Sequence, residues 1–214
     1  MTADDVIDTL RGAPADTDRL RDRLARDAQR GGLVDVLVRS VESPIGELIL
    51  AATPRGLAYV AFEGESRDEV LQLLATKIGP RVVSASTPGT PSGGTGDADI
   101  ASVLDDATTQ LHDYLAGRRR EFTLPLDTVL ATGFRGLVQR RLSEVGYGRT
   151  ATYREIATAL DKPGAVRAVG TACATNPLPL VWPCHRILRS DGGLGGYRGG
   201  LEVKKRLLAM ESAA

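Results

Sequence analysis

The chain has 214 residues, of which 42% are hydrophobic, and its 27 acidic residues balance its 27 basic ones. This composition supports a buried core and excludes wholesale disorder. Charges, glycines or prolines interrupt every apolar run, so no membrane-spanning helix is expected. The N-terminus lacks the basic and then apolar pattern of a secretory signal, and we therefore expect a cytoplasmic protein.

The first thirty-odd residues are dense in charge. Leu10, Leu20 and Leu24 indicate one or two amphipathic helices, and Gly12-Ala13-Pro14 would separate them. Residues 1–33 are therefore expected to form a helical charged extension without chemistry of its own.

Residues 34–126 are predicted to form a small N-terminal α/β domain. Apolar runs bounded by turn residues indicate strands, and apolar residues at helical spacing indicate helices. The sequence predicts strands at 34–38, 48–52, 57–62 and 82–83, helices at 66–78 and 100–115, and a Ser-, Thr-, Pro- and Gly-rich loop at 84–96.

Residues 127–214 are predicted to form a mostly helical domain, with helices at 134–145, 153–160, 165–174 and 202–211. Thr152 and Glu155 have the spacing of a capping box at the start of the second helix. The turn at 161–164 makes the second and third helices a helix-turn-helix candidate. Small residues on the third helix allow close approach to another helix or to a DNA groove. Between residues 133 and 172 the cations outnumber the anions, although net charge alone argues for no partner.

The chain has two cysteines, Cys173 and Cys184, and two histidines, His112 and His185. They are too few and too widely spaced for a structural zinc site, so no metal is expected. In a reducing compartment, a pair of cysteines more often means one reactive and one unreactive thiol than a disulfide.

Cys184 stands in the motif Pro183-Cys184-His185-Arg186, after an apolar segment that is predicted to be a strand at 178–182. The proline fixes the backbone just before the thiol, and the neighbouring His and Arg favour the reactive thiolate. Cys184 is therefore a candidate nucleophile. The alternative is a buried thiol that serves only as a small apolar side chain.

This motif resembles the active site of the O6-alkylguanine-DNA alkyltransferases, also called methylated-DNA–protein-cysteine methyltransferases. Asn176-Pro177 lies before it, residues 192–200 resemble the glycine-rich pocket loop of that family, and residues 201–211 resemble its closing helix. Further matches at 43–46, 111–117, 122–127, 146–157 and 167–170 extend the resemblance over roughly residues 34 to 211.

The resemblance implies an α+β fold, with a small N-terminal α/β domain and a mostly helical C-terminal domain that carries the helix-turn-helix. It implies DNA repair by irreversible, single-turnover transfer of an alkyl group from O6-alkylguanine, with O4-alkylthymine as a second candidate substrate, to Cys184. The expected partner is double-stranded DNA, bound in the minor groove by a monomer, with the damaged base flipped out. No cofactor is expected.

Site roles also follow from the resemblance. Cys184 would be the nucleophile, His185 its base through a water molecule, and Glu211 the group that orients His185. Tyr153 would donate a hydrogen bond to the leaving guanine, and Asn176 would hold the turn before the active site. The residues expected to bind DNA are Arg167, Ala168, Thr171, Tyr153 and Arg186. The residues expected to line the substrate pocket are Pro179, Val181, Trp182, Tyr197, Arg198 and Gly199.

The chain departs from the family pattern at Gly133, Arg135, Gln139 and Arg198. Three other functions remain as alternatives. An alkyltransferase-like protein that only binds DNA would lack the cysteine, and a plain helix-turn-helix transcription factor would leave the motif and the glycine loop unexplained. In a cysteine protease, Cys and His are normally distant in sequence.

Overall fold

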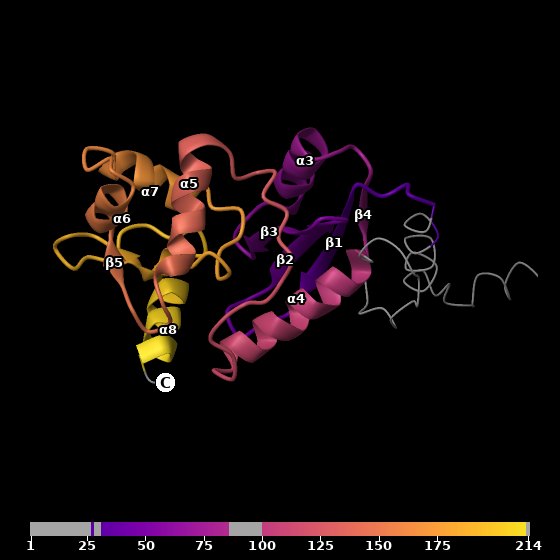
Figure 1. The fold of residues 1–214 in the computed structure, drawn as a ribbon. Coiled ribbons are helices and arrows are strands. Elements are labelled where there is room, and N and C mark those ends of the chain that lie inside the picture. Colours follow the sequence, from indigo (N-terminus) through magenta and orange to yellow (C-terminus); the bar gives the residue numbers. More distant parts are fainter. Residues whose placement is uncertain (1–26, 28–30, 86–99, 213–214) are drawn as a thin grey trace, which may run out of the picture.

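A computed structural model of the chain describes residue 27 and residues 31–85 and 100–212. Apart from residues 27 and 31, the segment 1–31 in which helices are expected lies outside the described residues, as does the expected loop beyond Ala85. Figure 1 shows a part built on a β-sheet beside a mostly helical part. This arrangement confirms the predicted α+β class.

The sheet has four strands in the order β3-β2-β1-β4. They are β1 (Val36–Val41), β2 (Leu48–Thr53), β3 (Gly56–Phe62) and β4 (Val82–Ser84). β4 is parallel to β1, whereas β1, β2 and β3 pair antiparallel. All four predicted strands are confirmed.

Two helices pack on the sheet: α3 (Arg67–Lys77) and α4 (Ile100–Leu115). Side chains alternate across β2, so Leu50 belongs to the core cluster that includes α4, while Ile49 joins the cluster with Leu74 of α3. The sheet is therefore buried on both faces, which explains why its strands are apolar almost throughout.

The helical part contains α5 (Gly133–Arg141), α6 (Tyr153–Ala159), α7 (Val166–Ala174) and α8 (Leu201–Ser212). The predicted single helix at 134–145 is wrong at its end, because α5 stops at Arg141 and a short 3-10 turn, η1 (Leu142–Glu144), follows. Val145 is extended, and its carbonyl accepts a hydrogen bond from Arg186 at 2.6 Å instead of continuing the helix. Each helix in the described part of the chain is too short or too polar to cross a lipid bilayer.

The predicted strand at 178–182 is also wrong. These residues form irregular turns, and Leu180 has a left-handed backbone with φ of 73°. Alternating prolines remove the N–H donors that a strand ladder needs. The Asn176 side chain closes the turn instead, donating to the Trp182 carbonyl at 2.7 Å and accepting from the Leu178 N–H at 3.0 Å.

After this turn the chain forms η2 (Cys184–Arg186) and then β6 (Ile187–Leu188), which pairs in parallel with β5 (Ala151–Thr152) just before α6. The pairing fixes the motif against the start of the helix-turn-helix.

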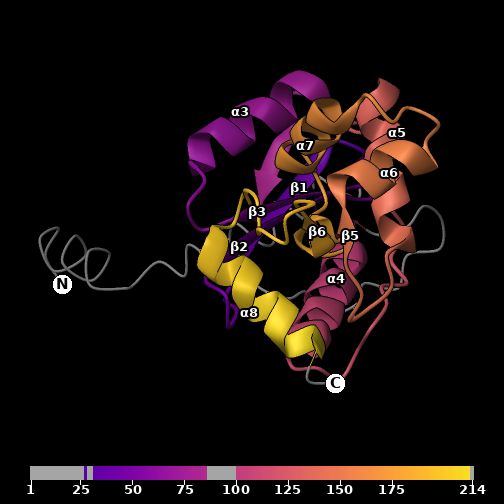
Figure 2. The same ribbon diagram turned by 90° about the vertical axis from the view of Figure 1, so that its left-hand side faces the viewer.

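The two parts are joined through β3. The Val60 N–H donates to the Pro177 carbonyl at 2.8 Å, and Leu57 exchanges hydrogen bonds with Pro125 and Asp127 at 2.9 Å. Figure 2 shows the C-terminal end of α8 close to α4. The nucleophile motif is therefore held between both parts of the molecule.

Candidate active site

Cys184 is 5% exposed and lies at a cavity of about 420 Å³. The cavity is bounded by α6, α7 and the loop before α8. Its lining residues are Tyr153, Gly170, Cys173, Ala174, Cys184, Arg189, Gly195, Gly196, Tyr197 and Arg198. The thiol therefore faces a space of the size that holds a small ligand.

Of the pocket residues expected from the sequence, Tyr197 and Arg198 line this cavity, whereas Pro179, Val181, Trp182 and Gly199 are not among its lining residues. Pro179 and Trp182 are buried in the turn before the motif. The residues of α7 that line the cavity were not predicted to do so. The small side chains of that helix, which allow a close approach, were the feature of the sequence that could have indicated it.

His185 is fully buried, and its Nε2 lies 3.0 Å from Oε1 of Glu211 on α8. Its Nδ1 is buried without a hydrogen-bond partner among the described residues. Burial lowers the pKa of His185 and outweighs the opposing effect of Glu211, so the ring is neutral near pH 7. With Nε2–H donating to the carboxylate, Nδ1 is left as a free acceptor.

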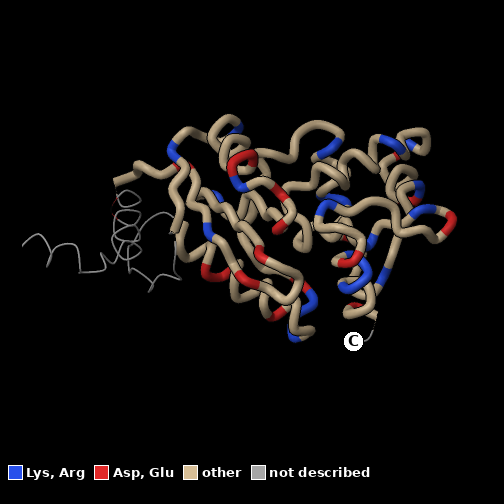
Figure 3. The backbone as a smooth tube through the Cα atoms, turned by 180° about the vertical axis from the view of Figure 1, so that it is seen from behind, with Lys and Arg blue, Asp and Glu red and all other residues tan. Residues whose placement is uncertain are grey.

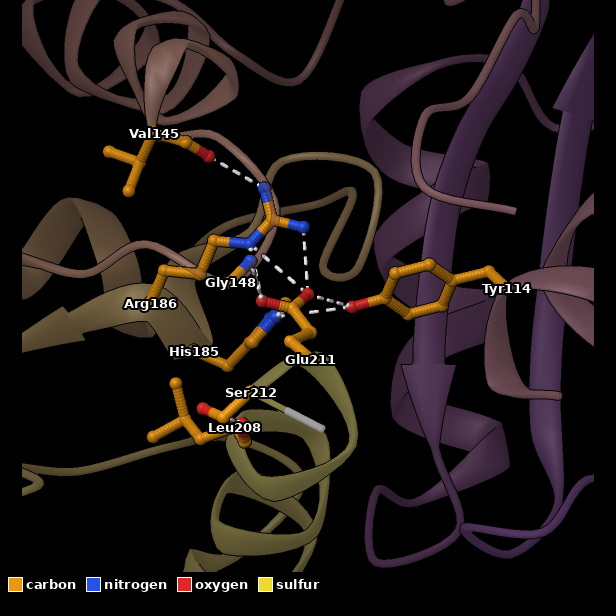
Figure 4. Close-up of polar contacts among 8 residues, drawn as sticks. All are labelled: Tyr114, Val145, Gly148, His185, Arg186, Leu208, Glu211 and Ser212. Atoms are coloured by element: carbon orange, nitrogen blue, oxygen red, sulfur yellow. Dashed lines mark hydrogen bonds and ion pairs between the residues drawn. The ribbon is translucent and has the colours of Figure 1, made fainter. Parts of the chain in front are cut away.

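Glu211 is surrounded by donors, as Figure 4 shows. Arg186 Nε contacts both carboxylate oxygens at 2.9 and 3.1 Å and its Nη2 donates at 2.7 Å, while the Tyr114 hydroxyl donates to Oε1 at 2.5 Å. The Gly148 N–H adds a contact at 3.3 Å. Burial raises the pKa of Glu211, but the hydrogen bonds from His185, Arg186 and Tyr114 outweigh it and bring the pKa to about 2.

Arg186, which is expected from the sequence to bind DNA, has its side chain buried against Glu211 in the structure. Its side chain is 6% exposed, and its guanidinium is held by Glu211 and by the Val145 carbonyl. A guanidinium with these partners orients the Glu211 carboxylate, and the contact of Arg186 with DNA stays a prediction.

Sequence reasoning did not find Tyr114. It lies on α4, in the other part of the molecule, and its hydroxyl is 3.2 Å from His185 Nε2 as well as hydrogen-bonded to Glu211. A tyrosine on the apolar face of an amphipathic helix has the pattern of a core residue, so no local signal marked it.

Burial raises the pKa of the Cys184 thiol, while the Asn176 amide and the charges of Arg198 and Lys204 act in the opposite direction. Lys204 is fully buried, and its ammonium donates to the Ile187 carbonyl at 2.6 Å and to the Leu194 carbonyl. The resting thiol is thus protonated, and its activation requires a base.

Tyr153 is the first residue of α6, after the predicted capping box of Thr152 and Glu155, which the structure confirms. Its hydroxyl lies so close to the loop that a Cβ at Gly195 would come within 2.7 Å of it. Burial raises the pKa of Tyr153, with Cys173 and Cys184 acting in the same direction. The hydroxyl therefore stays protonated, and it lines the same cavity as Cys184.

Arg167, Ala168 and Thr171 are exposed on α7. The same helix contributes Gly170 and Ala174 to the cavity wall, and a Cβ at Gly170 would meet nothing within 4 Å. Figure 3 shows basic residues along the helical part of the molecule. The helix-turn-helix thus presents an open surface beside the thiol cavity.

Two family models match the chain. The 6-O-methylguanine DNA methyltransferase ribonuclease-like domain matches residues 36–128, and the DNA binding domain of the same name matches residues 133–213. The methylated-DNA–protein-cysteine methyltransferase of Methanosarcina barkeri is 36% identical over 80% of this chain and 94% of its own length. The one of Mycolicibacterium paratuberculosis is 38% identical over 81% and 90%.

Solved structures of methyltransferases of this kind also resemble the chain. The O6-methylguanine methyltransferase of Mycobacterium tuberculosis superposes with a TM-score of 0.65 at 32% identity, covering 83% of this chain and 93% of that one. A structure of the OGT of the same organism in complex with DNA gives a TM-score of 0.64 at 31% identity and the same coverage.

Proposed function

The chain belongs to the 6-O-methylguanine DNA methyltransferase family, and we propose that Cys184 is the residue that receives the alkyl group. The protein is a methylated-DNA–protein-cysteine methyltransferase, which repairs DNA by transferring an alkyl group from guanine O6 to its own cysteine, irreversibly and once per molecule. The observation that carries the assignment to Cys184 is its place in the cavity directly before the buried His185–Glu211 pair.

The thiol proton leaves first. Side chains of adjacent residues diverge, so His185 acts on Cys184 through a bridging water. His185 Nδ1 is buried and has no hydrogen-bond partner in the described part of the chain, so it would bind this water. The proton passes from the thiol through this water to Nδ1. Glu211 stabilises the resulting imidazolium across its 3.0 Å contact with Nε2.

The thiolate of Cys184 then attacks the alkyl carbon in line with the breaking bond. The S–C bond forms as the C–O6 bond breaks, and the bond electrons leave with guanine. Tyr153 donates a hydrogen bond to the departing base, which stabilises the charge that develops on it. The guanine anion takes up a proton at N1 from water, and the His185 imidazolium returns the thiol proton to water, so the products are S-alkylcysteine and intact guanine. We leave O4-alkylthymine as a second candidate substrate.

The partner is DNA, and the finer mode of binding is part of our proposal. Exposed Arg167, Ala168 and Thr171 on α7 suit a minor-groove contact, in which Arg167 replaces the flipped nucleotide in the stack. The open space above Gly170 supports a close approach. We propose a monomer that acts in the cytoplasm, with the DNA-binding domain beginning near residue 127.

The test is intact-protein mass spectrometry after mixing with a duplex that carries one O6-methylguanine, followed by peptide mapping. We expect one methyl group per protein, on the peptide that contains Cys184. Cys184→Ala should bind the duplex and gain no mass, while Cys173→Ala should still be methylated.

Methylation of Cys184→Ala would overturn the assignment. A duplex that stays bound to the unmodified protein without any mass gain would instead support a protein that only binds damaged DNA.

A further inference from the structure

The wall of the cavity opposite α7 is formed by the pocket loop, residues 192–200, which contributes Gly195, Gly196, Tyr197 and Arg198. The loop contains neither helix nor strand. Its position therefore depends on side-chain contacts rather than on a backbone ladder.

Arg198 reaches from this loop to the sheet part of the molecule. Its Nη1 donates to the Tyr59 hydroxyl at 3.0 Å and its Nη2 to the Val60 carbonyl at 2.5 Å. Its Nε lies 3.1 Å from Glu65 Oε1, and its guanidinium lies over the Tyr59 ring at 5.0 Å from the centroid. Nη1 and Nη2 therefore both donate hydrogen bonds to one site beside β3, and Nε lies within ion-pair distance of Glu65 there without a hydrogen bond to it.

The partners of Arg198 are themselves fixed. Glu65 accepts the Phe62 N–H at 2.8 Å and faces the Tyr59 hydroxyl at 3.3 Å. The Arg198 and Glu65 side chains are only 16% and 18% exposed. Such a multidentate, largely buried contact is more specific in geometry than a surface ion pair.

The residues on either side of Arg198 are pressed against the same strand. A Cβ at Gly199 would come within 2.8 Å of the Phe62 ring, and the Tyr197 ring packs edge-on to Phe62 with 5.3 Å between centroids. The contact at Arg198 thus fixes the aromatic wall of the cavity that Tyr197 provides.

We propose that Arg198, Tyr59 and Glu65 form a latch through which the sheet part of the protein sets the position of the pocket loop, and so the size of the alkyl group that reaches Cys184. The proposal deepens the alkyl-transfer function given above and rests on it. With the latch closed, the wall is fixed and small groups are favoured. With it released, the loop moves outward and bulky groups enter more readily.

The first test compares rate constants for transfer to Cys184 from duplexes with O6-methylguanine and with O6-benzylguanine. Arg198→Ala should raise the benzyl-to-methyl ratio by about tenfold, the scale at which a pocket discriminates by size. Glu65→Gln should change the ratio in the same direction, and the double variant should add little to Arg198→Ala because both act through one contact. Arg198→Lys keeps the charge but not the two-pronged geometry of the guanidinium. Its benzyl-to-methyl ratio should therefore lie between those of the unmodified protein and Arg198→Ala.

Arg206→Ala is the matched control. Arg206 also bridges the two parts, from α8 to the Pro44 carbonyl, but it is exposed and does not line the cavity. Its loss should leave the ratio unchanged.

The second test does not depend on activity. Hydrogen exchange followed by mass spectrometry should show faster exchange of residues 192–200 in Arg198→Ala than in the unmodified protein or in Arg206→Ala. Unchanged loop exchange would overturn the latch, and so would an unchanged ratio in a folded Arg198→Ala. A lack of methyl transfer by the unmodified protein would refute the proposed function instead, and the exchange comparison would still decide on the latch.

Discussion

At the scale of single residues, the site depends on the hydrogen bonds that the buried carboxylate of Glu211 accepts. Its carboxylate accepts hydrogen bonds from Arg186, His185 and Tyr114, and the last of these comes from the other part of the molecule. Removal of one donor leaves a buried charge partly unsatisfied, which costs more than an ordinary hydrogen bond contributes.

Tyr114→Phe should therefore lower the free energy of unfolding by about 2 kcal/mol, since the hydrogen bond is made to a charged group. It should also slow alkyl transfer, because Glu211 and His185 lose a contact that fixes their orientation. Urea unfolding and single-turnover kinetics measure the two effects.

Tyr147→Phe is the control for this change. The Tyr147 ring packs edge-on against Tyr114, but its buried hydroxyl has no hydrogen-bond partner among the described residues. Removal of that hydroxyl should leave stability unchanged or slightly higher. Equal losses in both variants would contradict a specific contribution of the hydrogen bond from Tyr114 to Glu211.

Sequence motifs located Cys184 and His185, because the two are adjacent in a recognisable string, and Glu211 through the helix that follows. They could not locate Tyr114, because its role exists only once α4 and α8 meet in space. They did not predict that Arg186 pairs with Glu211, since a charged residue beside a nucleophile gives no sign of whether its side chain turns inward or outward.

At the scale of elements, the position of α7 depends on Gln139, one of the departures from the family pattern. Gln139 is buried on α5, and its amide donates to the carbonyls of Ala172 and Thr175 at 3.0 and 3.1 Å. The last carbonyls of a helix have no partners within it, so this side chain caps the end of α7. Two further departures, at Gly133 and Arg135, lie at the exposed start of α5.

Gln139→Leu should lower the free energy of unfolding by about 1–3 kcal/mol, because the buried Ala172 carbonyl and the partly buried Thr175 carbonyl lose their donor. It should also weaken DNA binding, since α7 carries Arg167. Gln72→Leu, at an exposed position on α3, should change stability by less than about 0.5 kcal/mol. Urea unfolding of both variants and a DNA titration of Gln139→Leu test this, and wild-type stability in Gln139→Leu would contradict it.

Most helices and strands could be predicted from the sequence, because apolar periodicity and capping residues act over a few neighbouring residues. The capping box of Thr152 and Glu155 at the start of α6 is an example. The segment 178–182 could not, because an apolar run between prolines has the composition of a strand. Its actual shape is set by the Asn176 side chain, which bonds to both ends of the turn.

At the scale of the whole molecule, the Glu211 network joins the two parts and makes that junction sensitive to acid. The pKa of Glu211 is about 2 in the folded protein against an ordinary value of 4.5. A lowered carboxyl pKa stabilises the fold fully above the ordinary value, and this stabilisation is lost as the pH falls towards the folded value.

Stability should therefore fall as the pH drops from about 4.5 to 2. Glu211→Gln should be less stable at neutral pH and should lose less stability within this window. The lowered pKa values of Asp35, held by Arg81, and of Glu155, held by Thr152, act in the same direction in both proteins. Urea midpoints measured across this pH range decide the matter, and parallel curves would exclude a contribution from Glu211.

The hydrogen bonds that join β3 to the rest of the chain have a further consequence. β3 is the edge strand of the sheet, and an open edge is a template on which a strand of another molecule can add. Here the outer edge is occupied by the molecule's own Pro125, Asp127 and Pro177 and by Arg198. Loosening of the segment before Cys184 would thus uncover this edge at Val60 at the same time as it disturbs the site, so the protection of the sheet edge and the chemistry share a contact.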